Sequence, residues 1–441
     1  MNHSFDVAVV GLGPVGATCA ALLGTLGLKT VAIERSPAVY DKPRAFALDH
    51  EAMRVFEDIG VAEAVAPHTA PFTPSEYYGV DGRLIKRLGA LPKPWPLGWP
   101  PSMVFRQPAV EDILRKRAAE VAEVILDEVV SLDGEKLTLR NGSTLAARYV
   151  VGCDGASSTL RRLLGIEYED LDFDQAWLVA DLLVKEEALP RLPEVSVQYC
   201  EPARPATYLI GVGNHRRWEI MLDPGEEPDV WKLLARWITP ADADLWRAAS
   251  YRFHALVARQ WRRGNLFLAG DAAHQQPPFT GQGMCQGIRD VANLAWKLKH
   301  GKDRLLDTYE LERKTHVKKL TGVIKEIGKV IGERNPAAAR ERDRRLIAEA
   351  GGKVQTVPRQ NLIPPLEAGL LSREPHPANG TLFPKDGGRG WRVVRSPSMK
   401  DWFERHQCAA AVVRPDHYVY GVARDDAALD RLLADVSKEL Q

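Results

Sequence analysis

The sequence predicts an α/β fold in which a Rossmann-like parallel sheet carries an inserted antiparallel sheet. The chain opens with a strand, a glycine-rich turn, a helix and a second strand. Its middle part is then rich in short strand-like runs, and after residue 265 a buried strand and a long helix return. Strands that alternate with helices indicate a parallel sheet, whereas a run of strands indicates a separate antiparallel one.

The opening segment has the pattern of a βαβ unit. Phe5 to Val10 is a short apolar run that ends in a glycine-rich turn, and Ala17 to Leu26 is the helical stretch after it. Lys29 to Ile33 is a second strand, which Glu34 closes. This order of elements favours a parallel sheet.

Two helices and a hairpin are expected before residue 150. Asp49 can cap a helix that runs through Asp58, and a second helix covers Val110 to Ala119. Asn141-Gly142 lies between two strand-like runs, which is the strongest short-range signal for a hairpin.

The middle of the chain reads as an antiparallel sheet. It contains the strand-like runs Trp177–Val184, Val195–Tyr199, Tyr208–Val212 and Trp218–Met221. Leu266 to Ala269 then resumes a buried strand, and Gly283 to Lys299 is a strong helix. We therefore expect a sheet domain that is inserted into the first domain.

The C-terminal part is expected to begin with a linker. Proline and glycine are concentrated between Gly351 and Gly390, so we assign 351–381 as the linker and 382–441 as a small unit. This unit should hold two strands and a helix, at Ala409–Val413, Tyr418–Val422 and Asp426–Val436. We expect it to have a packing or oligomer-contact role, because its one cysteine, Cys408, has no CxxC partner.

Composition narrows the function classes. The 59 Lys and Arg nearly balance 58 Asp and Glu, which argues against nucleic acid or a membrane surface as a partner. No apolar run of about 18 residues is present and the N-terminus leaves no room for a signal peptide, so we expect a cytoplasmic protein. The five cysteines are scattered, so we expect no metal site.

The glycine-rich turn predicts a dinucleotide site. Gly11, Gly13 and Gly16 form GxGxxG between a strand and a helix, and we expect this turn, with Pro14 and Val15 inside it, to bind the cofactor. The glycines allow a tight turn, backbone approach to a pyrophosphate and close helix packing. Glu34, followed by Arg35, ends the second strand, where a carboxylate can bind ribose hydroxyls. The motif alone does not separate FAD from NAD.

A second constellation points to flavin. Gly270 and Asp271 end an apolar strand, and a proline- and glycine-rich loop leads from them to a helix near Gly283. A strand-end aspartate can accept a hydrogen bond from a ribityl hydroxyl, and glycines let backbone amides approach the edge of a flavin ring.

With these motifs the sequence resembles the class A FAD-dependent aromatic hydroxylases, the group of p-hydroxybenzoate hydroxylase and phenol hydroxylase. Within the group it is most similar to the 3-(3-hydroxyphenyl)propionate hydroxylase-like monooxygenases. The resemblance implies a glutathione-reductase-type FAD-binding domain over 1–175 and 252–350. It also implies a substrate-binding sheet domain over 176–251, with 70–105 contributing to the substrate side, and a curtailed thioredoxin-like C-terminal unit.

The resemblance assigns cofactor roles to single residues. Arg44 would approach the FAD pyrophosphate, and Gln107, with Arg106 beside it, would reach the ribityl chain. Asp154 and Gly155 match an element that serves both FAD and NAD(P)H, although Ser157 stands where many relatives have arginine. The flavin ring would be lined by Pro277, Gly281, Gln282, Gly283 and Met284.

No catalytic residue is assigned from the sequence. His274 is a candidate in the flavin loop, where a structural hydrogen bond is favoured over acid–base work. His50 is a candidate near Arg44, where a solvent-facing or capping role is favoured. Tyr208 and Phe46 could contact substrate, and core packing is an equal alternative for each.

The resemblance implies that NADH or NADPH reduces FAD and that reduced flavin with O₂ gives a C4a-hydroperoxide, which hydroxylates a phenolic substrate. Another FAD-fold oxidoreductase, such as a halogenase or a reductase, is an alternative. A non-catalytic flavin-binding accessory protein is the alternative from another class. The specific phenol, the choice between NADH and NADPH, and a homodimer stay open.

Overall fold

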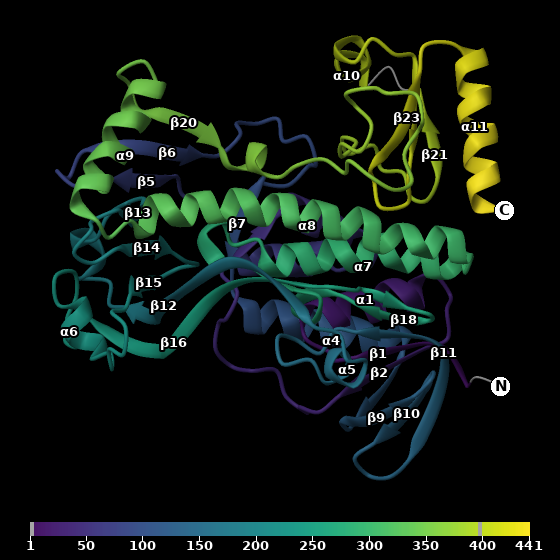
Figure 1. The fold of residues 1–441 in the computed structure, drawn as a ribbon, viewed down its shortest axis with the longest axis horizontal. Helices are drawn as coiled ribbons and strands as arrows, with labels where there is room; N and C mark the ends of the chain where they lie inside the picture. Colours follow the sequence, from purple (N-terminus) through teal and green to yellow (C-terminus); the bar gives the residue numbers. More distant parts are fainter. Residues whose placement is uncertain (1–3, 396–398) are drawn as a thin grey trace.

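The computed structural model describes residues 4–395 and 399–441. It places them in a mixed α/β fold with an eight-stranded sheet, a nine-stranded sheet and two three-stranded sheets (Figure 1). The predicted mixed α/β class is confirmed.

The eight-stranded sheet is built around the predicted opening unit. Its main path runs in the order β17-β18-β11-β1-β2-β8, and β1 pairs in parallel with both β2 and β11. The strands are β1 (Phe5–Val10), β2 (Thr30–Glu34), β8 (Glu123–Leu126), β9 (Val129–Asp133), β10 (Lys136–Leu139), β11 (Thr144–Gly152), β17 (Arg262–Arg263) and β18 (Leu266–Leu268). The parallel strands bring the ends of β1, β2 and β18 to one edge, where the site is built.

Three helices pack on this sheet. They are α1 (Pro14–Thr25), α4 (Gln107–Val121) and α7 (Gly283–His300), and α1 contacts both of the others. Helix α1 begins three residues before the predicted start, because Gly13 is its N-cap and Pro14 fits the first helical position. Helix α7 ends at Gly301, whose φ of 68° suits glycine, with three basic residues in its last turn.

The shorter elements connect these layers. A small sheet orders its strands β3-β7-β4. Asp49 caps α2 by accepting a hydrogen bond from the Ala52 N–H, as the sequence predicts. The elements are β3 (Ala47–Asp49), α2 (His50–Asp58), α3 (Ala62–Val65), β4 (Thr69–Pro71), β7 (Ser102–Phe105) and α5 (Thr159–Leu163).

The nine-stranded sheet is larger than the expected 176–251 domain. Its order is β19-β16-β12-β15-β14-β13-β5-β6-β20. Its strands are β5 (Ser75–Tyr78), β6 (Leu84–Gly89), β12 (Tyr168–Val184), β13 (Ser196–Tyr199), β14 (Ala206–Ile210), β15 (His215–Met221), β16 (Ala243–Ala258), β19 (His274–Gln275) and β20 (Gln355–Pro358). Strand β20 corrects one prediction, because it pairs with β6 although 351–381 was expected to be a plain linker.

The two faces of the large sheet have different partners. The outer face packs with the short helix α6 (Val230–Leu234) around Tyr208, Trp218 and Leu234. Part of the inner face packs on the long helix α8 (Asp303–Gly332) through Trp177, and α9 (Pro336–Glu349) lies against β6. Figure 1 shows α8 running from this sheet to the C-terminal unit.

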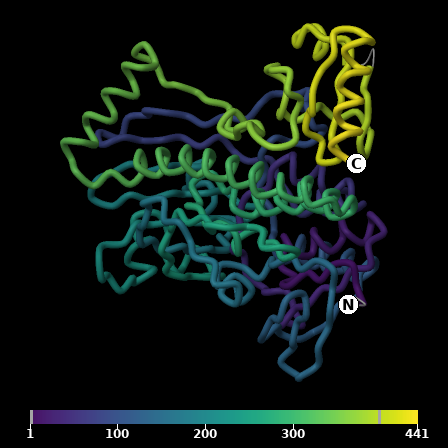
Figure 2. The backbone as a smooth tube through the Cα atoms, turned by 45° about the vertical axis from the view of Figure 1, so that its right-hand side comes forward, coloured from purple at the N-terminus to yellow at the C-terminus, as the bar shows by residue number. Residues whose placement is uncertain are grey.

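The C-terminal unit lies beside α7 and α8 in both ribbon views (Figures 1 and 2). It contains β21 (Arg392–Val394), α10 (Lys400–Arg405), β22 (Ala410–Val413), β23 (Val419–Ala423) and α11 (Asp426–Leu440), with the strand order β21-β22-β23. Tyr420 and Leu432 of this unit share one apolar cluster with Trp296 of α7 and Leu305 of α8. The predicted strands and helix are therefore present, and they dock on the rest of the molecule.

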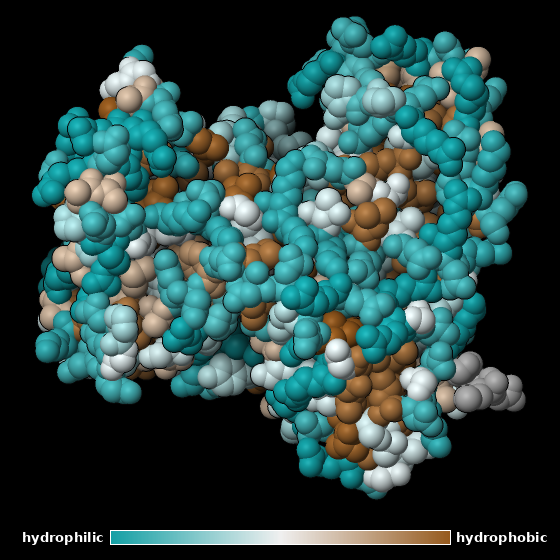
Figure 3. All heavy atoms as spheres, in the orientation of Figure 1, coloured by the Kyte–Doolittle hydropathy of each residue, from teal (hydrophilic) through white to brown (hydrophobic). Residues whose placement is uncertain are grey.

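The surface view shows a mostly hydrophilic face with scattered apolar patches (Figure 3). Leu126 and Val130 are among the exposed apolar side chains near the β9–β10 hairpin. Among the residues that the structure describes, no helix is both long and apolar enough to span a bilayer. The same residues contain no cluster of metal-ligating side chains.

Candidate active site

The glycine turn has the geometry that its spacing predicts. Gly11 has a φ of 93°, and a Cβ there would lie 2.6 Å from the Cys153 carbonyl oxygen. A Cβ on Gly16 would lie 1.9 Å from the Gly11 carbonyl oxygen. Gly13 has no atom within 4 Å of its Cβ position, so open space lies in front of the α1 N-terminus. The turn thus packs tightly behind and leaves room in front for a phosphate group.

Glu34 lies directly beside this turn. It is buried at the end of β2, and its carboxylate accepts hydrogen bonds from the Leu12 N–H at 2.6 Å and the Ser36 N–H at 2.8 Å. Each carboxylate oxygen keeps a further acceptor position. Arg35 is exposed and forms a 3.9 Å ion pair with Glu128.

The Asp154–Gly155 segment lies behind the same turn. A Cβ on Gly11 would lie 2.8 Å from the Asp154 Cα. The Asp154 carboxylate accepts from the Ser158 hydroxyl at 2.5 Å and from the Leu160 N–H at 3.0 Å, and Gly155 has a φ of 79°. Asp154 thus shapes the start of α5 and supports the turn from behind.

Gly270 and Asp271 follow β18 on the same edge of the sheet. Gly270 has a φ of 61°, and its Cβ position lies 3.3 Å from Val15 of α1. The Asp271 side chain reaches solvent. The protein that surrounds it nevertheless raises the pKa of its carboxyl by desolvation, and the charges of His274 and Arg44 oppose the shift. An accessible carboxyl that is walled by protein is typical of a side chain that lines a concave site.

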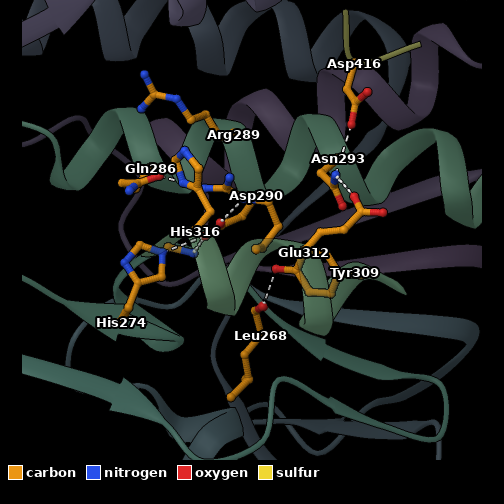
Figure 4. Close-up of polar contacts among 12 residues, drawn as sticks. Leu268, His274, Gln286, Arg289, Asp290, Asn293, Tyr309, Glu312, His316 and Asp416 are labelled. Atoms are coloured by element: carbon orange, nitrogen blue, oxygen red, sulfur yellow. Dashed lines mark hydrogen bonds and ion pairs between the residues drawn. The ribbon is translucent and has the colours of Figure 1, made fainter. Parts of the chain in front are cut away.

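Asp290 and His274 belong to a buried network (Figure 4), which holds the Gly270 turn in place. The Asp290 carboxylate of α7 accepts from the Gly270 N–H at 3.0 Å and contacts the His274 Nε2 at 2.7 Å. Arg313 of α8 donates to Asp290 at 3.0 Å. Burial would raise the pKa of Asp290, but His274 and Arg313 outweigh it and hold that pKa low. His274 thus lies inside a structural network and stacks on Trp261, with ring centroids 5.3 Å apart.

The predicted flavin loop covers Pro277 to Met284. It contains a short 3₁₀ turn, Pro278–Thr280, and Gly281 has a φ of 63°. A Cβ on Gly281 would lie 2.5 Å from the Ala47 Cβ, so this position requires glycine. The Gln282 side-chain oxygen accepts from Arg289 at 2.9 Å, and Gly283 and Met284 begin α7.

Gln107 organises the loop that carries Arg44. Its side-chain oxygen accepts from the Arg44 N–H at 2.8 Å and the Ala45 N–H at 2.7 Å, and its amide nitrogen donates to Glu111 at 3.2 Å. Arg44 and Arg106 are both exposed, which leaves their guanidinium groups available to phosphate. In the structure Gln107 therefore positions Arg44, and the predicted ribityl contact stays a prediction.

The α1 N-terminus and its surroundings carry the groups that FAD requires. Open space lies before the α1 N-terminus, an acidic side chain stands on either side of it at Glu34 and Asp271, and Arg44 supplies a positive charge. A dinucleotide needs amide donors for its pyrophosphate and carboxylate acceptors for its hydroxyls. The residues present fit the cofactor.

The inner face of the large sheet supplies a polar wall opposite Phe46. Arg217 makes two bonds to the Asp181 carboxylate, at 2.7 and 3.0 Å, and donates to the Arg44 carbonyl at 3.1 Å. Its guanidinium lies 4.9 Å from the centre of the Phe46 ring, and His215 is edge-on to that ring at 5.3 Å. The sheet is thereby tied to the loop that carries Arg44.

Glu219 lies on the same face, two residues beyond Arg217. It is buried, and desolvation raises the pKa of its carboxyl to about 7, with Arg217 opposing the shift. Along β15 it lies between Arg217 and Met221, and Met221 shares an apolar cluster with Phe279 of the flavin loop. Sequence reasoning missed Glu219, because strand alternation alone does not identify the face that meets the flavin loop.

Two of the weaker candidate residues lie in the interior of the protein. Tyr208 is buried on the outer face against Trp218, with ring centroids 5.0 Å apart, so it faces away from the flavin loop. His50 was expected to face solvent or to cap a helix, but it is buried in the first turn of α2, and desolvation lowers its pKa. The core-packing alternative thus holds for Tyr208, whereas the expected solvent-facing or capping position of His50 is wrong, because Asp49 is the N-cap and His50 is buried.

Comparison with known proteins gives a consistent picture. The FAD binding domain family matches residues 4–323. A probable NADH-specific resorcinol 4-hydroxylase of Rhodococcus jostii (strain RHA1) is 36% identical, over all of this chain and 95% of the relative. A 3-(3-hydroxy-phenyl)propionate/3-hydroxycinnamic acid hydroxylase of Mycobacterium avium (strain 104) is 35% identical over 81% of this chain and 66% of the relative.

Solved structures share the fold. The flavin-dependent monooxygenase PieE, in complex with FAD and substrate, has a TM-score of 0.81 at 19% identity, over 99% of each chain. Aklavinone-11 hydroxylase, in a ternary complex with FAD and aklavinone, has a TM-score of 0.79 at 20% identity, over 100% of this chain and 99% of the other.

Proposed function

This chain belongs to the FAD-binding family of flavin monooxygenases that hydroxylate aromatic rings, and from this premise we propose that it hydroxylates a resorcinol-type phenol with NADH and O₂. It is an enzyme with FAD as its cofactor. Its relatives are named hydroxylases, so a halogenase, a reductase or a non-catalytic flavin-binding protein is not favoured. The observation that supports the proposal most is the position of Phe46: it packs against His215 and Arg217 of the polar wall, and its neighbour Ala47 lies against Gly281 of the flavin loop.

The relative that matches over the full chain suggests the substrate and the reductant. It is named as NADH-specific and as acting on resorcinol, whereas the hydroxyphenylpropionate hydroxylases match this chain over a smaller share of their own length. We therefore put resorcinol before the phenylpropionates, and NADH before NADPH. We propose that the enzyme is soluble and cytoplasmic.

The cofactor contacts follow from the edge of the sheet. The first-turn N–H groups of α1 would bind the pyrophosphate together with Arg44, Glu34 would accept from ribose hydroxyls, and Asp271 would accept from the ribityl chain. FAD supplies the transfer of electrons from NADH to O₂, which no side chain can perform.

The chain's own residues prepare the aromatic ring. Phe46 and the flavin loop provide apolar walls that exclude water, and the Asp181–Arg217 pair fixes the sheet against the Arg44 loop. Glu219 has a pKa of about 7, so it can take a proton from a bound phenol at neutral pH. An ionised phenol is more electron-rich and therefore reacts more readily with an electrophilic oxygen.

The test measures NADH oxidation by FAD-loaded enzyme with and without resorcinol. We expect resorcinol to accelerate flavin reduction, 3-(3-hydroxyphenyl)propionate to act more weakly, and NADPH to replace NADH poorly. A reduction rate that no phenol changes would count against an aromatic hydroxylase. Chromatography of the product, compared with authentic hydroxylated standards, identifies the ring that reacts.

A further inference from the structure

One buried arginine differs from all the others in its surroundings. Eight arginines lie in the buried class among the residues that the structure describes, namely Arg54, Arg217, Arg247, Arg289, Arg313, Arg342, Arg359 and Arg414. Seven of them have a carboxylate within 4.0 Å. The pairs are Arg54 with Asp386, Arg217 and Arg247 with Asp181, Arg289 with Asp49 and Glu51, Arg313 with Asp290, Arg342 with Asp343, and Arg414 with Glu312 and Asp416. Arg359 has no such partner in the described part of the chain.

Arg359 lies at the flavin loop. It follows β20, which holds it at the edge of the large sheet through the pairing of Pro358 with Gly89. Its Nη2 donates to the Thr280 carbonyl, and its guanidinium lies 4.2 Å from the centre of the Phe72 ring. Phe72 belongs to the same apolar cluster as Phe46, so the guanidinium lies between the flavin loop and the proposed substrate wall.

The donors of Arg359 are only partly used. Within the described residues its Nε has no hydrogen-bond partner, and its single hydrogen bond is the one from Nη2. Its charge interacts with Tyr77, Cys285 and Asp49, but the Asp49 carboxylate is already bonded to Arg289. Burial accordingly lowers the pKa of Arg359.

An unpaired buried cation is costly, and one carbonyl and one ring face compensate for it only in part. Since the seven other buried arginines of the described residues are each paired with a carboxylate, Arg359 stands out as the one whose charge is available to an external anion. The position beside the flavin loop and Phe72 gives that anion an aromatic neighbour. A planar guanidinium with free N–H groups binds an oxyanion through directed hydrogen bonds.

We propose that Arg359 binds an anionic oxygen of the aromatic substrate and so selects and orients ionised phenols. The inference deepens the proposed function and rests on it. Two sources supply the same chemistry: the phenolate oxygen of any phenol, or the carboxylate of a phenylpropionate. A guanidinium beside a phenolate also lowers the pKa of the bound phenol.

The test uses holoenzyme and 4-nitrophenol, whose phenolate absorbs visible light. The dissociation constant and the pH midpoint of bound-phenol ionisation are measured for wild type, Arg359→Met, Arg359→Lys and Lys353→Met. Lys353 is exposed in the same segment and is the matched charge-removal control. We expect wild type to bind the phenolate with a lowered midpoint, Arg359→Met to bind it roughly 10- to 100-fold more weakly with a raised midpoint, and Lys353→Met to equal wild type.

Two turnover arms identify the source of the anion. If the phenolate is bound, Arg359→Met raises the KM for both resorcinol and 3-(3-hydroxyphenyl)propionate; if the carboxylate is bound, only the KM for the acid rises. Retention of FAD through gel filtration shows that the variant is intact. Arg359→Lys keeps the charge but loses the planar pair of N–H groups, so we expect it to bind the phenolate more weakly than wild type, and it decides the test where the Met variant loses flavin. The proposal is overturned if wild type does not bind the probe, or if a flavin-retaining variant, Met or else Lys, matches wild type in affinity and pH midpoint. Binding without hydroxylation in wild type would instead refute the proposed reaction and leave this assignment standing.

Discussion

Two carboxyl groups on the inner face of the large sheet behave in opposite ways. Burial would raise the pKa of Asp181, but Arg217 and His215 outweigh it and keep that pKa low. Glu219 has no ion pair within 4.0 Å in the described residues, and its pKa rises to about 7. The same face of the sheet therefore carries one carboxylate, on β12, whose pKa is held low and one carboxyl group, on β15, that titrates near neutral pH.

The pKa of Glu219 predicts a pH-dependent stability. The folded state holds the proton up to about pH 7, whereas in the unfolded chain the ordinary pKa is 4.5. Its favourable contribution is complete below pH 4.5 and is lost as the pH rises to 7, by about 3 kcal/mol. Glutamine does not titrate, so the unfolding free energy of Glu219→Gln minus that of wild type should increase by about 3 kcal/mol as the pH rises from 4.5 to 7, as measured by urea unfolding. Exposed Glu227→Gln is the control, and a flat difference for Glu219→Gln would refute the assignment.

Asp271 gives a second prediction at the scale of single residues. Asp271→Ala should weaken FAD binding by about 1.5–3 kcal/mol, because the ribityl chain loses a charge-assisted hydrogen bond. Flavin absorbance after dialysis measures the occupancy. Asp81→Asn, an exposed change on a loop, should keep wild-type occupancy. Equal FAD affinity in Asp271→Ala and wild type would place the ribityl acceptor elsewhere.

The elements that sequence patterns predict best are those with local signals. The GxGxxG turn, the Asp49 cap and the Asn141-Gly142 hairpin are each encoded within a few residues. The face on which Tyr208 lies could not be predicted, because alternation in a strand does not say which side meets the flavin domain. Arg359 was missed for a related reason: its proline-rich segment gave no strand signal, and β20 forms only because β6 offers it an edge.

The contact between the C-terminal unit and α8 carries a prediction at the scale of elements. Arg414 follows β22 and donates to Glu312 of α8 at 2.6 Å and to Asp416 at 2.7 Å, with all three side chains buried. Arg414→Met would leave two buried carboxylates without that partner and should lower the unfolding free energy by about 3–5 kcal/mol. Exposed Arg424→Met should leave it within about 0.5 kcal/mol of wild type.

The outcome of that comparison is read from the midpoint of urea unfolding. A small effect for Arg414→Met would mean that the unit is only loosely attached.

A second contact of the C-terminal unit refines its expected role. Tyr418 donates at 2.5 Å to Glu51, whose other oxygen accepts from Arg289. Arg289 in turn binds Gln282, so the unit is linked to the flavin loop as well as packed on the helices.

At the scale of the whole molecule, two sheets and the helices between them bring distant segments to one place. The glycine turn comes from the N-terminus, the flavin loop from the region around residue 280, and Arg359 from the segment after α9. Residues from β12 and β15 close the opposite side. The sequence motifs predicted the cofactor half of this site, whereas the substrate half depends on pairings between residues far apart in the chain.

As a flavin monooxygenase, this chain should insert one oxygen atom from O₂ into an aromatic ring. The most direct test supplies FAD-loaded enzyme with NADH, resorcinol and ¹⁸O₂ and analyses the product by mass spectrometry. We expect one ¹⁸O atom in each new hydroxyl group and one NADH consumed per product. Consumption of NADH that yields only labelled hydrogen peroxide, with resorcinol and every other phenol unchanged, would contradict it.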